Sequence, residues 1–292
     1  MANLKAIRKR ISSVKSTQKI TRAQKMVAGA RLTRAQHRIQ ALRPYAVKTA
    51  QVLAEVAGSG TEDEGAASDH AHPLLARRAE KTVLLLVITS DRGLCGAFNT
   101  NILRAATRIW QEREAAGQSV KIITIGRKGR DYFKRRNAPV LEAITGVWER
   151  LDMEQARSVA RKVLAPFVKG EVDSIYLVYN EFKSVIQQRV IVERLLPIER
   201  KPITPQEPGL DYLYEPGPEK IYAEMLPKHV EIQVWRALLE SAAAEHGARM
   251  AAMDAATRNA GDMIDRLTLY LNKVRQAAIT KEIIEVVSGA GS

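Results

Sequence analysis

The sequence predicts an antiparallel coiled coil, formed by the N- and C-terminal helices of one chain, with a Rossmann-like α/β domain inserted between them. Three observations support this fold class. Residues 1–57 carry one long helical pattern, residues 81–195 alternate between strand and helix signals, and residues 228–287 can form a second long helix. The predicted boundaries are 1–57 for the first helix, 58–80 for a linker, 81–218 for the α/β domain and 219–292 for the C-terminal helix.

The first helix is organised by positions that recur at alternating spacings of three and four, which is the spacing of a coiled-coil seam. Leu4, Ile7, Ile11 and Val14 open this seam. Pro44 falls inside the pattern, so we expect a kink there or a helix end nearby. The later seam positions are Gln18, Thr21, Lys25, Ala28, Leu32, Ala35, Ile39, Leu42, Ala46, Thr49, Leu53 and Val56.

Outside its seam the first helix is strongly basic. Residues 1–57 hold thirteen Lys and Arg but a single acid, Glu55, so twelve of the fourteen net positive charges of the chain lie here. Pairs such as Lys15 and Lys19 place like charges one turn apart, which weakens an isolated helix. The helix therefore needs an apolar partner along its seam and an acidic surface outside it.

The C-terminal part of the chain supplies that partner. We expect a short helix over residues 219–226 and then, from Pro227 onward, a helix of about 90 Å over residues 228–287. Nine alanines between residues 241 and 260 allow another helix to approach closely. The predicted seam positions of the long helix are Ile232, Trp235, Leu239 and Ala242, followed, one residue out of phase, by Ile264, Leu267, Leu271, Val274 and Ala278.

The middle of the chain is predicted to be an α/β domain with a mostly parallel sheet, because strand and helix signals alternate there. The last two strands are separated by a short link and favour an antiparallel hairpin. Six prolines in residues 197–218 predict an irregular return to the C-terminal helix. The predicted strands are Lys81–Thr89, Val120–Ile125, Ser174–Tyr179 and Ser184–Leu195. Three helices are predicted between them: one that ends near Ala116, one that begins at Gly126, and one from Met153 to Lys169.

Three stretches could carry chemistry, and for each the sequence favours a structural interpretation. The turn at residues 89–99 follows a strand, as phosphate-binding loops do, but lacks both glycine-rich nucleotide fingerprints, so a tight turn presenting Arg92 is favoured. Residues 126–129 match the GXXG pattern of an RNA-clamping loop but follow a strand instead of a helix. Cys95 could be a nucleophile, but no histidine lies within twenty residues, which favours a buried thiol.

Composition limits the remaining possibilities. Cys95 is the single cysteine, so neither an intrachain disulfide nor a cysteine-based zinc site is possible. His70 and His72 form a His-x-His pair in the linker, but without further ligands we predict a polar loop and no metal site. The N-terminus has no apolar signal region, and no run approaches the roughly 20 residues that span a bilayer. We therefore expect no cofactor and no direct bilayer insertion.

Motifs at four places in the chain carry a more specific resemblance. They are residues 18–28 (QKITRAQKMVA), 89–99 (TSDRGLCGAFN), 212–216 (YLYEP) and 275–282 (RQAAITKE), and residues 237–250 fit the same pattern. In this order they resemble signatures of the gamma subunit of F-type ATP synthases, bacterial type, over nearly the whole chain. The alternative that the residues leave open is a basic coiled-coil protein that binds nucleic acid, against which the first helix offers one aromatic residue, Tyr45, and no stacking platform.

The resemblance implies a non-catalytic central-stalk rotor. In that family the terminal helices form a shaft inside a ring of three alpha and three beta subunits, and the α/β domain stands beside the epsilon subunit and the membrane c-ring. Rotation of the shaft drives the beta-subunit sites in turn through ATP synthesis or hydrolysis, coupled to ion transport such as that of hydrogen ions. The chain would then be a peripheral protein at the cytoplasmic face of the bacterial inner (plasma) membrane.

The resemblance also assigns roles to individual residues. Arg31, Arg34 and Arg92 match basic positions that face acidic beta-subunit loops, and Arg275 and Gln276 match a pair that contacts beta-subunit loops higher on the shaft. Tyr212 and Tyr214 match the foot near epsilon and the c-ring, and residues 279–287 resemble the tip that sits in an apolar sleeve. The seam residues of the implied shaft include Leu4, Ile7, Ile11 and Val14 on one helix and Leu267, Leu271 and Val274 on the other.

The chain departs from the family pattern in a few places. Gln24 stands where methionine is common, close to the beta-subunit loop. Because Cys95 has no partner cysteine, the thiol switch of the chloroplast relatives cannot operate. The first motif begins at Leu4 without a presequence, which favours a bacterial protein over an imported one.

Overall fold

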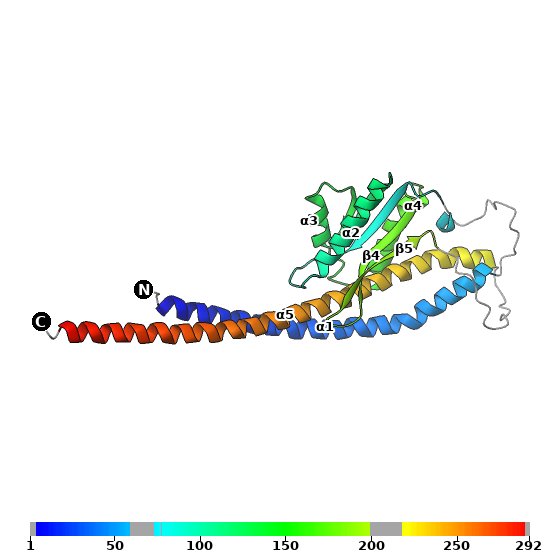
Figure 1. The fold of residues 1–292 in the computed structure, drawn as a ribbon. Coiled ribbons are helices and arrows are strands. Elements are labelled where there is room, and N and C mark those ends of the chain that lie inside the picture. The colour runs from blue at the N-terminus through cyan, green and yellow to red at the C-terminus, as the bar shows by residue number, and fades with distance from the viewer. Residues whose placement is uncertain (1–3, 59–72, 77, 199–217, 290–292) are drawn as a thin grey trace. The chain divides into compact units, whose positions relative to one another are not determined.

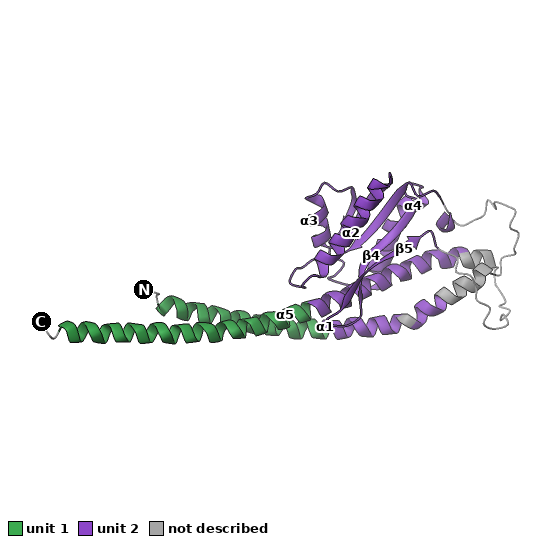
Figure 2. Cartoon of the chain, in the orientation of Figure 1, with its two compact units in different colours: residues 1–30, 249–292 green, residues 31–248 purple. Residues whose placement is uncertain are grey.

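The computed structural model describes residues 4–58, 73–76, 78–198 and 218–289. The chain divides into two compact units, one made of residues 1–30 and 249–292 and the other of residues 31–248 (Figure 2). We call the first the helix-pair unit, because it contains the ends of the two long helices. We call the second the α/β unit, because it contains the sheet together with the inner parts of both long helices.

Two long helices dominate the chain, α1 (Leu4–Gly58) and α5 (Pro218–Gly289) (Figure 1). The expected break at Pro227 is wrong, because α5 continues through this proline. Leu226 and Val230, on either side of it, are fully buried, and this packing offsets the one backbone hydrogen bond that a proline removes. Pro44 likewise lies inside α1, so no helix end occurs there.

The α/β unit contains a five-stranded sheet in the order β3-β2-β1-β4-β5. Strands β1 to β4 are parallel to their neighbours, and β5 pairs antiparallel with β4, which confirms the predicted mostly parallel sheet and its terminal hairpin. Strand β3 is absent from the sequence-based prediction, because its half-buried edge position leaves no continuous apolar run. The strands are β1 (Thr82–Ile88), β2 (Ser119–Ile125), β3 (Val140–Ile144), β4 (Ser174–Phe182) and β5 (Gln188–Leu196).

Three shorter helices and one 3-10 turn complete the α/β unit. The side chain of Asp152 caps the start of α4 by accepting a hydrogen bond of 2.9 Å from the backbone N–H of Gln155, which satisfies one of the free donors at a helix start. The elements are η1 (Pro73–Leu75), α2 (Phe98–Ala115), α3 (Arg127–Lys134) and α4 (Met153–Val168).

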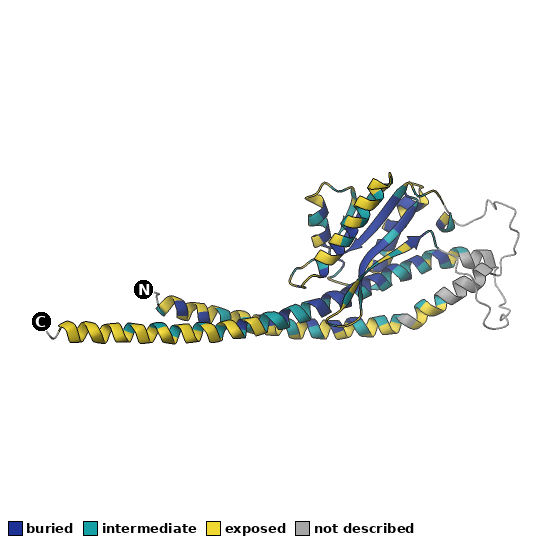
Figure 3. Ribbon diagram, in the orientation of Figure 1, coloured by how far each residue is buried: buried dark blue, intermediate teal, exposed yellow. Residues whose placement is uncertain are grey.

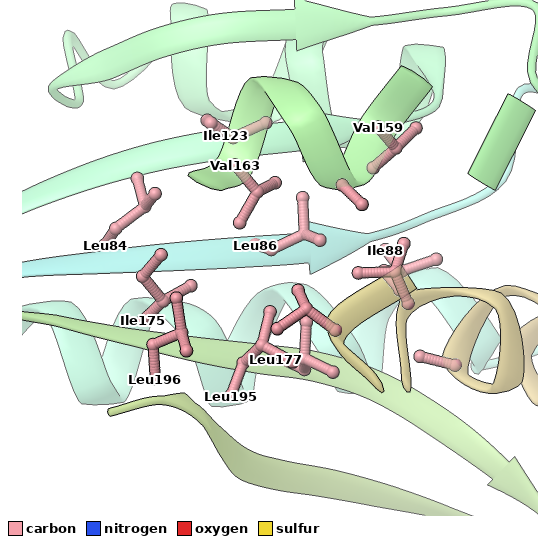
Figure 4. Close-up of a cluster of buried hydrophobic side chains, with 14 of the residues drawn as sticks. Leu84, Leu86, Ile88, Ile123, Val159, Val163, Ile175, Leu177, Leu195 and Leu196 are labelled. Carbon is pink, nitrogen blue, oxygen red and sulfur yellow. The ribbon is translucent and has the colours of Figure 1, made fainter. Parts of the chain in front are cut away.

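The sheet is buried on both faces, as a parallel sheet requires. Leu84, Leu86 and Ile88 of β1 point to the face covered by α4, where Val159 and Val163 meet them (Figure 4). The alternate residues of β1 belong to a second cluster with α2 and α3. Residues 226–238 of α5 supply five buried apolar side chains to the α4 cluster, so this long helix is part of the domain core: Leu226, Val230, Val234, Ala237 and Leu238. The buried colouring of the sheet and of this part of α5 is visible in Figure 3.

Gly126, between β2 and α3, provides a test of this packing. Its backbone is left-handed, with φ at +90°, and an added Cβ would lie 2.3 Å from the carbonyl oxygen of Thr89. We predict that Gly126→Ala lowers the free energy of unfolding by about 2–5 kcal/mol, from left-handed strain and overpacking together. Gly117→Ala is the matched control, because Gly117 is also left-handed but has open space around it. It should cost only the strain, about 1–2 kcal/mol, in urea unfolding of the full chain; equal costs for the two variants would contradict the clash.

Candidate partner-binding surface

In the helix-pair unit, α1 and α5 lie side by side and antiparallel. The hydroxyls of Thr21 and Thr257 are 2.8 Å apart, and the side-chain amide of Gln18 donates to the carbonyl of Thr257 at 3.4 Å. The ammonium of Lys25 lies 2.5 Å from the carboxylate of Asp254. Residue numbers rise along α1 as they fall along α5, so these contacts confirm the predicted antiparallel coiled coil.

The buried positions of α1 follow the seam predicted from the sequence. All fourteen predicted seam positions from Leu4 to Thr49 are buried or half-buried. Of the other residues described in that range, only Gln24, Gly29 and Gln36 are half-buried, and the rest are exposed. Gly29 faces α5, since an added Cβ would lie 3.5 Å from the sulfur of Met250, at ordinary contact distance. The same narrow stripe therefore runs along this helix from Leu4 to Thr49.

The far part of α5 has an equally narrow stripe. Between residues 262 and 280 the half-buried positions are Ile264, Leu267, Leu271, Val274 and Ala278, which are the predicted seam positions. Residues 279–289 are all exposed, and Figure 1 shows α5 extending past the N-terminal end of α1. Several of these exposed side chains are large and apolar, including Ile283, Ile284 and Val286. A helix end that exposes several large apolar side chains among a few charged ones is suited to contact with another protein.

The outer face of α1 is a basic surface with little internal compensation. Within the described part of the chain, nine exposed cations of α1 make neither an ion pair nor a side-chain hydrogen bond. Such a row of unpaired positive charge attracts an acidic surface over distances of about 8–10 Å at physiological salt. The nine residues are Arg8, Lys9, Arg10, Lys15, Lys19, Arg22, Arg31, Arg34 and Lys48.

Lys25 differs from these nine residues, since it is half-buried in the seam and meets Asp254. A hydrogen bond from Lys25 lowers the pKa of the Asp254 carboxyl below its ordinary value of 3.8, and the nearby guanidinium of Arg258 lowers it further. The predicted seam thus includes one ion pair among its apolar and small residues. Because it joins the two helices at one level, this pair helps to define their register.

The turn after β1 is held together by its own polar groups. The side chain of Asn99 accepts a hydrogen bond from the backbone N–H of Ser90 at 3.0 Å and donates to the Ser90 hydroxyl at 2.8 Å. The Ser90 hydroxyl in turn donates to the carbonyl of Arg92 at 2.6 Å. Because these groups bond to one another, the turn has the character of a structural support that leaves the Arg92 side chain exposed.

Cys95 and the GXXG stretch are both parts of the same support. The Cys95 thiol is buried and lies 3.2 Å from the side-chain nitrogen of Asn99. The N–H of Gly129 donates to the Thr89 hydroxyl at 2.8 Å, which in turn donates to the carbonyl of Ile125 at 2.7 Å. The GXXG stretch therefore begins α3 against the end of β1, as the structural interpretation predicts.

The residues assigned by resemblance are distributed over both units. Arg31, Arg34 and Arg92 are exposed residues of the α/β unit, and Arg275 and Gln276 are exposed residues of the helix-pair unit. Tyr212 and Tyr214, like the His70 and His72 pair, lie outside the described residues. Among the residues that are described, no three His, Cys, Asp or Glu side chains gather as a metal site would require. No described helix is long and apolar enough to span a bilayer.

Two polar clusters of the α/β unit were not found from the sequence. One joins Arg236 of α5 to Glu193 of β5 and Tyr179 of β4. The other surrounds Glu80, whose carboxylate accepts hydrogen bonds from Arg113 at 2.8 Å and from Tyr176 at 3.1 Å. Burial raises the pKa of Glu80, but the hydrogen bonds from Tyr176 and Arg113 outweigh it, so the net pKa is lowered. No sequence spacing signals either cluster, because its members come from distant elements.

A long antiparallel helix pair with an unpaired basic face, joined to an α/β domain, defines a structural stalk protein. Comparison with known proteins makes this class specific. A family profile described as ATP synthase matches residues 3–292. The ATP synthase gamma chain of Sorangium cellulosum (strain So ce56) is 54% identical over 318 residues, covering 99% of this chain and 98% of that protein. The gamma chain of Anaeromyxobacter sp. (strain Fw109-5) is 50% identical over 290 residues, covering 99% of both chains.

Solved structures share the fold. The chain resembles the central stalk and c-ring structure of the Tetrahymena thermophila mitochondrial ATP synthase with a TM-score of 0.62 and 25% identity, covering 81% of this chain and 99% of that one. It resembles the rotor of the Euglena gracilis mitochondrial ATP synthase with a TM-score of 0.65 at 18% identity, covering 94% of this chain and 98% of that one. The chain therefore belongs to the ATP synthase gamma-chain family. It is a non-catalytic central-stalk subunit, and the nucleic-acid alternative finds no support.

The Lys25–Asp254 pair yields a prediction about pH. Because the pKa of Asp254 is lowered by folding, the unfolded chain binds more protons near pH 3.8, and stability falls as pH falls through this region. We predict that Asp254→Asn is less stable than wild type above pH 3.8 and that the difference shrinks as pH falls below it. Urea unfolding of the full chain, followed by helical circular dichroism, measures this. A difference that stays constant with pH would show that Asp254 has no lowered pKa.

Proposed function

We propose that this central-stalk subunit rotates within a hexamer of alpha and beta subunits and couples ion flow through a membrane c-ring to ATP synthesis or hydrolysis at the beta subunits. The observation that carries the proposal is the helix pair, with its narrow buried seam and its row of unpaired exposed cations, in a chain related over its whole length to ATP synthase gamma chains. The rotor has no reaction of its own to catalyse; its task is to transmit rotation.

A shaft must resist unwinding while its surface stays free to move. The seam supplies the resistance, since each buried CH₂ group contributes about 0.8 kcal/mol and the seam continues along α1 from Leu4 to Thr49. The outer face supplies the freedom, since an exposed ion pair is worth only about 0–1 kcal/mol. Contacts of this strength guide rotation without holding the shaft at one angle.

The partner loops are assigned by charge and by position. Arg31, Arg34 and Arg92 are exposed and have no carboxylate partner among the described residues, so they are available to acidic loops of the beta subunits. Arg275 and Gln276, exposed farther along α5, would contact beta-subunit loops near the tip. The apolar residues that follow fit an apolar sleeve formed by the hexamer. The foot that contacts epsilon and the c-ring is assigned to the region of Tyr212 and Tyr214.

The location follows from the complex. The subunit is a peripheral part of a membrane complex, and its Sorangium and Anaeromyxobacter relatives are bacterial proteins. We place it at the cytoplasmic face of the inner membrane, where the hexamer would have access to ADP and phosphate. Its positive surface would then be shielded by the hexamer and would not be exposed to cytoplasmic nucleic acid.

The rotor function is tested by removing the subunit. The complete complex is purified from native membranes, and ATP hydrolysis and ATP-driven ion pumping are measured with and without this chain. We expect the chain to co-purify with alpha, beta, epsilon and c subunits, and its loss to abolish ion pumping while the beta-subunit sites still bind nucleotide. A complex that pumps ions equally well without this chain would overturn the proposal.

Charge steering by the basic face yields a separate prediction. Replacing Arg31, Arg34 and Arg92 together with Gln should lower torque and the rate of coupled ATP synthesis, and should weaken their dependence on salt, because the long-range attraction is reduced. The matched control replaces Arg104, Arg108 and Arg161, three exposed arginines on α2 and α4, with Gln and thus removes the same charge. Torque in single-complex rotation and synthesis in vesicles are the readouts. Equal effects of the two triple variants would rule out specific steering.

A further inference from the structure

Rotation must pass between the α/β domain and the shaft, and α5 is the element that belongs to both. Within the α/β unit, apolar side chains such as Val230, Val234 and Ala237 hold α5 against the sheet. The burial of these side chains supplies cohesion, and their interdigitation resists turning, but the hydrophobic driving force itself is non-directional. Contacts with a defined geometry would therefore add to this packing in fixing how far α5 can turn about its own axis.

A row of polar contacts joins one flank of α5 to the hairpin of β4 and β5. The guanidinium of Arg236 places one nitrogen 2.7 Å from each carboxylate oxygen of Glu193 on β5. The phenol of Tyr179 on β4 donates to the same carboxylate at 3.0 Å. Burial raises the pKa of the Tyr179 phenol, so it keeps the proton that it donates. Glu193 is therefore held from the helix and from the neighbouring strand at once.

The contact continues along the same flank. One turn after Arg236, the carboxylate of Glu240 accepts a hydrogen bond of 3.0 Å from the backbone N–H of Phe182, at the end of β4. Two turns farther, Gly247 lies so close to Phe182 that an added Cβ would be 2.9 Å from its ring. The hairpin thus follows α5 over three turns, first by a charged pair, then by a backbone bond and then by close packing.

These contacts have the directional character that the apolar face lacks. A carboxylate that accepts several charge-assisted hydrogen bonds holds its partners in a defined orientation, and hydrogen bonds to charged groups are stronger than neutral ones. A rotation of α5 about its axis would move Arg236 and Glu240 away from the hairpin together. The two residues lie four apart, on one flank of the helix.

We propose that Tyr179, Glu193, Arg236 and Glu240 form a hairpin clamp that transmits torque between the α/β domain and α5. They are positioning residues: they touch no reacting group but prevent the shaft helix from slipping against the domain that would be driven by the c-ring. This inference rests on the proposed rotor function. It adds the place where torque crosses from the sheet to the shaft.

The test uses the complete synthase reconstituted in vesicles. Arg236→Ala, Glu193→Gln and Glu240→Gln each remove one part of the clamp, and each lost charged hydrogen bond should raise the population of a slipped α5 by about tenfold or more. We expect ions pumped per ATP hydrolysed to fall, most in a double variant of Arg236 and Glu240, while hydrolysis continues. Arg108→Gln, which breaks an exposed pair with Glu112 within α2, is the control and should leave the ratio unchanged.

Two further measurements separate torque transmission from folding. Thermal unfolding of each variant chain identifies any loss of stability, and Glu193→Gln keeps the side-chain volume if Arg236→Ala proves unstable. Exchanging the pair, with Glu193→Arg and Arg236→Glu together, should restore part of the pumping ratio, and Arg236→Lys should fall between wild type and Arg236→Ala. A normal ratio in stably folded clamp variants would overturn the clamp. If the otherwise unmodified complex pumps ions equally well after this chain is removed, the proposed rotor function itself is overturned, and not only the clamp.

Discussion

The structure depends on the burial of one narrow stripe along two long helices. Neither helix can be stable through local interactions alone, because α1 carries like charges one turn apart and the outer part of α5 is exposed at most of its positions. Packing along the stripe, together with Thr21, Thr257 and the Lys25–Asp254 pair, compensates for this. The basic surface is tolerated because the seam is continuous.

The α/β domain imposes a different requirement on α5. In the helix-pair unit only one stripe of this helix needs to be apolar, whereas residues 226–248 are buried on most sides. That explains the small side chains of this region, since alanine lets the sheet approach closely, and Gly247 leaves room for Phe182. The polar residues Arg236 and Glu240 of this stretch have partners on the β4–β5 hairpin. One helix is therefore built for two environments.

In both units, apolar burial and charged hydrogen bonds have different structural roles. Apolar seams and cores supply most of the cohesion between the elements, and a small number of charged hydrogen bonds adds to their orientation: Lys25 with Asp254 in the helix pair, Arg236 with Glu193 beside the sheet. On the outside, unpaired arginines such as Arg31 and Arg34 provide attraction without a defined geometry. For a rotating subunit, tight internal orientation combined with loose external contact is the required arrangement.

The sequence by itself determined the two long helices, the seam from Leu4 to Thr49, the parallel sheet with its hairpin, and the basic face, because each depends on local periodicity or on charge. It also carried the family motifs that contain Arg92 and Arg275. Only the tertiary structure decided that α5 continues through Pro227, that Val140–Ile144 is an edge strand, and that Glu193, Tyr179 and Arg236 meet. The first and last of these results depend on tertiary packing. The proline is tolerated because the residues around it are buried. Glu193 and Arg236 are 43 positions apart and come together only when the sheet and α5 assemble.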